Sequence, residues 1–77
     1  MATLVSTTGT EFTPSAGDFI ASSSNGPALL MRKNTTGAAY AVVGIVSGAI
    51  VVSNPVGGAV YRFDSYQGSI PTVQADQ

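Results

Sequence analysis

Residues 38–52 read AAYAVVGIVSGAIVV, and no charged side chain lies between Lys33 and Arg62. Seven of these residues are valine or isoleucine, whose branched Cβ atoms fit a pleated strand better than a helix. Along such a strand one face would carry Ala39, Ala41, Val43 and Ile45, and the other Tyr40, Val42, Gly44 and Val46. A strand that is apolar on both faces must be covered on both sides. We therefore predict a β-hairpin here, with its turn at Ser47–Gly48.

Two arrangements would cover the second face of this hairpin. In the first, the strand lies in the centre of the chain's own sheet. In the second, the face meets another subunit or another protein, because a chain of 77 residues builds one core and large uncovered apolar patches are uncommon on soluble monomers. We favour the second arrangement and predict an apolar and aromatic interface at Tyr40, Val42, Tyr61 and Phe63.

A membrane-crossing helix is the alternative structure for the same run. Gly44 and Gly48 have the spacing that lets helices approach closely in lipid, and Arg32 and Lys33 flank one end as anchors would. The fifteen residues of the run are fewer than the roughly twenty that a spanning helix needs, and Asn54–Pro55 follows soon after it. A small single-span membrane protein that uses residues 38–52 is therefore the alternative function, although we expect no membrane partner.

The remaining composition indicates β structure and excludes several classes of site. Val, Ser, Thr, Gly and Ala supply 45 of the 77 residues, while Lys and Glu together number two, too few for the charged faces of soluble helices. The absence of cysteine and histidine excludes disulfides and the usual zinc sites. Three cations and a formal charge of −1 argue against a nucleic-acid partner. We expect no metal and no cofactor.

Residues typical of catalysis are also lacking. Seventeen Ser and Thr hydroxyls have no imidazole base to activate them. The four acids, Glu11, Asp18, Asp64 and Asp76, are spread singly along the chain, without the pairing of a glycosidase or the clustering of a calcium loop. We predict that the chain is not an enzyme. A small ligand-binding β-module is a further hypothesis, but it needs a concave pocket that no sequence feature requires.

Short extended segments, separated by turn residues, fill the rest of the chain. We predict strands at 18–21, 28–33, 59–63 and 70–73, with a short helix as the alternative at 28–33. Turns are predicted at 12–17, 22–27, 34–37 and 53–58. In 59–63, Ala59, Tyr61 and Phe63 alternate with Arg62. The expected fold is all-β, a small sandwich or barrel of about six short strands with an extended N-terminal arm.

The N-terminal arm comprises residues 1–12, ahead of a compact β-domain at 13–77. Its threonines and Val5 favour a strand, but its apolar content is too low to bury a face. Adding such a strand to the sheet edge of a partner needs only backbone groups. We predict that the arm contacts a partner through Thr3, Leu4, Val5, Ser6, Thr7 and Thr8.

Residues 34–39 (NTTGAA) followed by 41–45 (AVVGI) resemble a segment of small head-decoration, or cement, proteins of tailed bacteriophages, of the lambda head-stabilising type. Residues 26–30 (GPALL) look like the strand that these proteins place before that turn. The resemblance covers residues 26–46. It implies a compact β-domain on the capsid surface, with an N-terminal arm that adds a strand to the major capsid protein.

We accordingly predict a non-enzymatic structural virion protein that binds the outer capsid surface and cements neighbouring capsid subunits. Its expected partners are the major capsid protein, copies of itself, or both, and it would be a homo-oligomer on the capsid lattice. Many identical weak contacts on a lattice add as avidity. The expected location is the virion, on the surface of the capsid.

Overall fold

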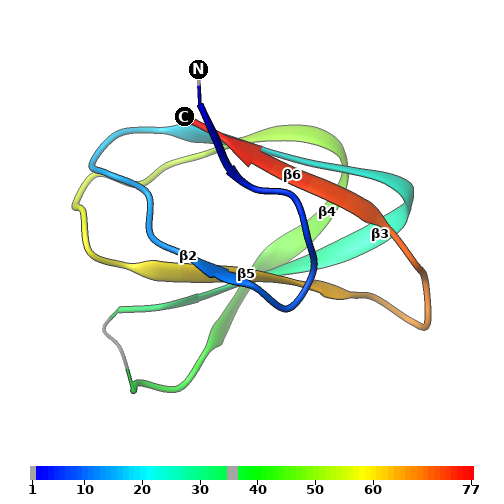
Figure 1. Ribbon diagram of the computed structural model, residues 1–77. Coiled ribbons are helices and arrows are strands. Elements are labelled where there is room, and N and C mark those ends of the chain that lie inside the picture. The colour runs from blue at the N-terminus through cyan, green and yellow to red at the C-terminus, as the bar shows by residue number, and fades with distance from the viewer. Residues whose placement is uncertain (1, 35–36) are drawn as a thin grey trace.

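The computed structural model describes residues 2–34 and 37–77, and those residues form six strands in a single sheet (Figure 1). The strands are β1 (Thr3–Val5), β2 (Glu11–Phe12), β3 (Phe19–Lys33), β4 (Ala41–Val52), β5 (Val60–Ser65) and β6 (Thr72–Asp76). All neighbouring pairs are antiparallel. The prediction of an all-β chain with about six strands is confirmed.

The sheet folds over on itself because β3 and β4 cross from one half of it to the other. The first half of β3 pairs with β6 and the second half with β5, while β4 pairs with β3 in both halves. On the far side, β1 pairs with β6 and β2 with β5. The two halves therefore face each other in a barrel-like sheet that is almost closed (Figure 1). Strands β3 and β4, at 15 and 12 residues, are longer than predicted.

Two predicted turns, at 22–27 and at Ser47–Gly48, are bends in continuous strands. Asn25, Gly26 and Gly48 do have the positive φ angles of turn residues, 61°, 128° and 89°. Pairing between β3 and β4 is interrupted there, so that residues 24–27 lie opposite Ser47 alone. Such a bulge bends a strand pair and increases its twist. The predicted hairpin at Ser47–Gly48 is therefore wrong, and the residues instead turn the β3–β4 ribbon from one half of the sheet into the other.

The other predicted elements lie close to their expected places. Of the predicted strand 18–21, residues 19–21 open β3, and 28–33 form its second half as a strand. The last strand begins two residues later than predicted and ends three residues later. Of the predicted turn at 34–37, residues 35 and 36 lie outside the described residues. The helical alternative for 38–52 is wrong because 41–52 form β4. None of the described residues belongs to a helix that is long and apolar enough to span a membrane.

The core lies between the two halves of the sheet and has four aromatic rings at its centre. Phe19 and Tyr61 pack edge to face with ring centroids 4.9 Å apart, and Phe12 stacks on Phe63 at 5.7 Å. Smaller apolar side chains complete the core: Val5, Ala21, Ala28, Leu30, Val46, Val52, Ala59, Val73 and Ala75. The predicted alternation in 59–63 is confirmed, since Tyr61 and Phe63 are buried and Arg62 lies on the outer face.

Candidate functional site: the uncovered edge of β4

β4 is an edge strand, and among the described residues only β3 pairs with it. A strand directs its backbone N–H and C=O groups alternately to its two sides. About half of the backbone groups in this twelve-residue strand are therefore left without a partner strand. Charged residues, proline and bulges commonly protect a free edge from pairing with another chain. β4 has no charged residue and no proline, and among these features it has the bend at Gly48.

Five large apolar side chains of β4 are exposed, on both faces of the strand. They are Val42 (63% exposed), Val43 (45%), Ile45 (50%), Ile50 (37%) and Val51 (68%). Only Val46 and Val52 of this strand are buried. A wholly internal central strand, the other arrangement weighed from the sequence, is therefore wrong. β4 combines an open backbone edge with an apolar surface that the described chain leaves uncovered, and such surfaces mark interaction sites.

The four residues predicted as an apolar and aromatic interface do not form one surface. Val42 lies on the exposed edge. Tyr61 and Phe63 are core residues, because the alternation of β5 points them inward, and a partner cannot reach them in the folded chain. Tyr40 lies half-buried just before β4, in a cluster of polar side chains.

The predicted N-terminal arm lies in the sheet. Thr3–Val5 is β1 and pairs with β6, and Ala2 and Gln77 exchange two backbone hydrogen bonds of 2.9 and 3.0 Å. Val5 belongs to the core, whereas Ser6, Thr7 and Thr8 are exposed in the turn that leads to β2. One edge of the arm is thus used within the chain. β1 offers three residues for strand addition, where β4 offers twelve.

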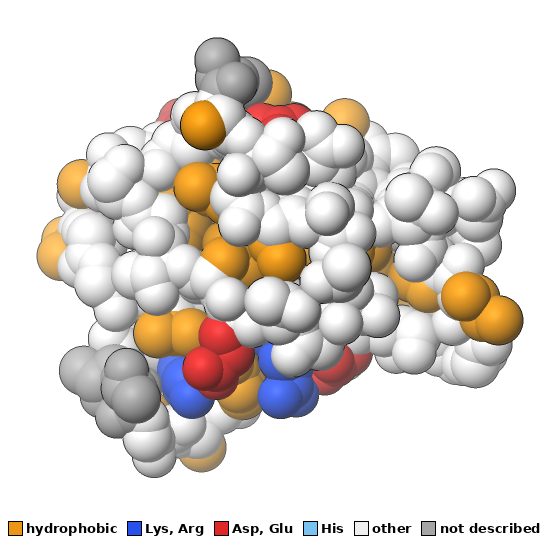
Figure 2. Space-filling view, viewed as in Figure 1, with side chains coloured by type: hydrophobic (Ala, Val, Ile, Leu, Met, Phe, Trp, Pro, Cys, Tyr) orange, Lys and Arg blue, Asp and Glu red, His pale blue; other side chains and the backbone are white. Residues whose placement is uncertain are grey.

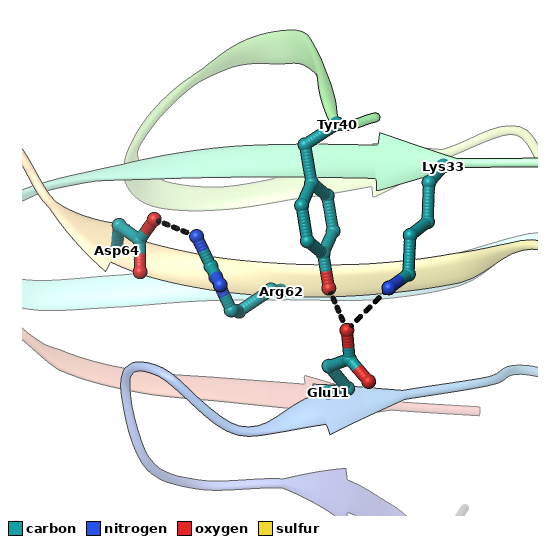
Figure 3. A network of polar contacts seen from close by, with 5 residues as sticks. All are labelled: Glu11, Lys33, Tyr40, Arg62 and Asp64. Atoms are coloured by element: carbon teal, nitrogen blue, oxygen red, sulfur yellow. Dashed lines mark hydrogen bonds and ion pairs between the residues drawn. The ribbon is translucent and has the colours of Figure 1, made fainter. Parts of the chain in front are cut away.

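Five polar side chains, here called the outer cluster, lie beside the start of β4: Glu11, Lys33, Tyr40, Arg62 and Asp64 (Figure 3). The Glu11 carboxylate accepts hydrogen bonds from Lys33 Nζ, at 2.7 Å, and from the Tyr40 hydroxyl. The Tyr40 ring lies 4.8 Å from Lys33 Nζ and 4.5 Å from Arg62 Cζ, within the range of cation–π contacts. Arg62 also pairs with Asp64 at 2.9 Å.

Through these contacts the outer cluster ties the segment that enters β4 to the outer face of β2 and β5. Figure 2 shows basic and acidic side chains together at the lower edge of the molecule and further acidic ones at its upper edge, with most of the visible face between them uncharged. Sequence reasoning missed this cluster because the sheet register assembles it from distant segments, with Glu11 opposite Arg62. No local spacing in the sequence would have indicated it.

The hydrogen bonds around the Glu11 carboxylate hold Glu11, Lys33 and Tyr40 in their ordinary charge states. The bonds from Lys33 and then from Tyr40 lower the pKa of Glu11 below 4.5. The bond to Glu11 raises the pKa of Lys33 above 10.5, while burial, followed by the bond to Glu11, raises the pKa of Tyr40 above 10.0. Glu11 is therefore ionised at neutral pH and accepts from a charged Lys33 and a neutral Tyr40.

A cavity of about 380 Å³ lies between the end of β3 and the first residues of β4. It is lined by Arg32, Lys33 and Asn34 together with alanine and valine residues from 38–43. The Arg32 guanidinium carbon lies 5.9 Å from the centre of the Tyr61 ring. Its Nε is buried and has no hydrogen-bond partner among the described residues.

The described residues contain no group of three or more His, Cys, Asp or Glu side chains that could hold a metal ion. No protein-family model, curated protein or solved structure matches this sequence.

Proposed function

We propose that this chain is a non-enzymatic structural subunit that joins a larger protein assembly by pairing β4 with a strand of its neighbour. The observation that carries the proposal is the open edge of β4 together with its five exposed valine and isoleucine side chains. In strand addition the backbone supplies affinity, and side chains at alternate positions supply specificity. β4 offers both over twelve residues.

The size of this surface favours a weak contact that is repeated many times. Covering five half-exposed aliphatic side chains contributes on the order of 4–8 kcal/mol. Association itself costs about 4–15 kcal/mol in lost translational and rotational freedom, and each backbone hydrogen bond adds only about 0.5–1.5 kcal/mol net. A single contact is therefore close to balance, whereas many copies on a lattice gain from avidity.

The partner that we propose is the major capsid protein of a tailed bacteriophage, with the bound chains cementing neighbouring capsid subunits on the outer surface of the virion. The resemblance of residues 26–46 to head-decoration proteins supports this choice. These residues span the second half of β3 and the first half of β4, so the resembling segment is the edge ribbon itself.

Co-sedimentation with empty capsid shells, assembled from the major capsid protein of the same source, tests this function. We expect the wild-type chain to pellet with the shells and to saturate. Ile45→Lys, on β4, should bind at least about tenfold more weakly, because a buried lysine disrupts an apolar contact. Ile70→Lys is the matched control, since Ile70 is 87% exposed and lies outside β4, and it should bind like the wild type.

Each part of the proposal has its own contrary result. A wild-type chain that stays in the supernatant overturns the capsid as the partner. An Ile45→Lys chain that pellets like the wild type overturns β4 as the contact. If the chain instead forms a dimer in solution that Ile45→Lys disrupts, and does not bind shells, then a second copy covers β4 and the cementing role is wrong.

A further inference from the structure

Arg32 differs from the other two cations of the chain in lacking a carboxylate partner among the described residues. Lys33 is paired with Glu11, and Arg62 with Asp64. Arg32 is half-buried at the end of β3, and its Nε–H is buried without an acceptor in residues 2–34 and 37–77. That Nε–H is closed off from the surface, so it is not the group that a ligand would reach. What a ligand could meet is the charge of the guanidinium, which no carboxylate of the described residues balances.

Arg62 provides a comparison. Its Nε is also buried without an acceptor within the described ranges, so this feature alone does not distinguish Arg32. The Arg62 guanidinium, however, already bonds to Asp64 at 2.9 Å and is covered by the Tyr40 ring at 4.5 Å. Arg62 is not among the residues that line the cavity of about 380 Å³, whereas Arg32 is. Among the described residues, Arg32 is thus the cation that has no carboxylate partner and lines a cavity with space for a ligand.

The walls of this cavity indicate the chemistry of the ligand. A guanidinium binds a carboxylate through two parallel hydrogen bonds. Residues with short apolar side chains, among them Ala38, Ala41 and Val43, also line the cavity, and they suit a hydrocarbon stem. The volume is at the lower end of the range of small-ligand sites.

We propose that this cavity binds a carboxylate on a short aliphatic stem, with Arg32 as its ion-pair partner. Resting on the function proposed above, we assign that carboxylate to the strand that docks on β4, because Ala41, Val42 and Val43 belong both to the cavity wall and to the docking edge. The docked strand would then carry apolar side chains along most of β4 and an acidic side chain opposite Ala41. An acidic side chain at that position would also fix its register.

The binding site itself is testable without any partner protein. The chain has two arginines, so its ¹⁵N spectrum contains two Nε–Hε signals, which Arg32→Lys assigns. We titrate wild-type protein with sodium butyrate and, at equal ionic strength, with sodium chloride. The Arg32 signal should shift with butyrate and saturate in about the millimolar range expected for so small a ligand, while the Arg62 signal stays in place. Equal shifts of both signals, or no saturable shift, would overturn the site.

The source of the carboxylate is tested on the capsid shells. If it belongs to the docked strand, Arg32→Gln should bind shells about tenfold or more weakly, and saturating butyrate should release the bound wild-type chain. Butyrate that shifts Arg32 but releases nothing, with Arg32→Gln bound as tightly as wild type, would overturn the assignment to the partner and leave a site for free carboxylates. Failure of all shell binding overturns the proposed function alone, since the titration stands without it. The butyrate arm also keeps the test decisive if Arg32→Gln folds poorly.

Discussion

Glu11 is the residue on which the outer cluster depends, because Lys33 and Tyr40 both donate hydrogen bonds to its carboxylate. Those bonds lower its pKa from 4.5 in the folded chain. A carboxyl group with a depressed pKa stabilises the fold above its unfolded pKa, and that stabilisation is lost as the pH falls through the lowered, folded-state pKa. We expect Glu11→Gln to destabilise the chain at neutral pH and to have little effect well below pH 4.5.

Urea unfolding of both chains, from neutral pH down to about pH 3, measures this difference. Asp18→Asn is the control, since Asp18 is exposed and forms no ion pair with any described residue. Its effect should be small throughout. A Glu11→Gln effect that stays constant over the whole pH range would contradict the role assigned to the carboxylate.

Tyr61 carries a polar contact inside the core. Its hydroxyl donates to Asn54 Oδ1 at 3.2 Å, and both residues are buried. Asn54 in turn donates from Nδ2 to the backbone carbonyl of Ser15 at 2.8 Å. Tyr61→Phe leaves the Asn54 oxygen buried and unpaired, so we expect a loss of about 1–3 kcal/mol in the free energy of unfolding, measured by chemical denaturation.

Tyr66→Phe is the matched control for that prediction. The Tyr66 side chain is half-buried, and its hydroxyl has no hydrogen-bond partner within the described parts of the chain. Its removal should change the unfolding free energy by less than about 0.5 kcal/mol. Equal losses for the two tyrosines would show that the Asn54 contact does not matter.

Residue-level prediction from the sequence succeeded where alternation decides the outcome. The pattern of 59–63 correctly grouped Tyr61 with Phe63 on one face. It did not show that this face is the inner one, so both were predicted as interface residues. The outer cluster escaped prediction because pairing of β2 with β5, and of β3 with β5, places its members side by side, and these registers have no local signature.

At the scale of elements, two glycines define the bend of the β3–β4 ribbon. Gly26 has φ +128°, and a Cβ there would lie 2.9 Å from Ser69 Cβ. Gly48 has φ +89°, but a Cβ there would meet open space. Backbone strain alone costs on the order of 1–2 kcal/mol for a residue other than glycine at such angles. We expect Gly48→Ala to lose about that much stability and Gly26→Ala to lose clearly more.

Denaturant unfolding of the two variants and the wild type checks this order. Ser69→Gly removes the clashing Cβ, but it also removes the hydroxyl that donates to the backbone carbonyl of Pro27 at 2.7 Å. It should therefore cost less stability in the Gly26→Ala background than in the wild type. Equal losses for the two alanine variants, or an equal cost of Ser69→Gly in both backgrounds, would contradict the close approach of the bulge to Ser69.

Element prediction failed at this same bend for a physical reason. Asn25–Gly26 and Ser47–Gly48 have the residue types of tight turns, and their glycines do adopt positive φ. The same dihedral angles serve a reversal of the chain or a bulge between two continuous strands. Which one forms depends on pairing between segments more than twenty residues apart, and a local pattern does not contain that information.

At the scale of the whole molecule, the uncovered edge should promote association of the free chain. Long apolar edges without charges are sites of edge-to-edge pairing, and one lysine placed there suppresses it. We expect Ile45→Lys to lower light scattering at high protein concentration while changing the unfolding free energy by no more than about 0.5 kcal/mol, because Ile45 is half exposed.

Ile70→Lys adds the same charge at a more exposed residue that lies outside β4. It should reduce scattering less than Ile45→Lys does. If the two lysines act equally, net charge explains the effect and the edge does not.

The sequence allowed the prediction that the apolar run around residues 39–46 exceeds what so small a chain covers. It did not allow prediction of where the uncovered surface would lie, because the same apolar run is compatible with a central strand and with an edge strand. The folding of β3 against both β5 and β6 leaves β4 at the edge. No property of the run itself identifies the protein that covers it.

Residue-resolved hydrogen–deuterium exchange along β4 tests the central claim most directly. In the dilute free chain, the amides that bond to β3 should be protected, and the alternate amides on the open edge should exchange about as fast as unstructured peptide. On capsid shells the open-edge amides should become protected as well. Open-edge amides that are already protected in the free chain, or that stay unprotected when the chain is bound, would contradict the account.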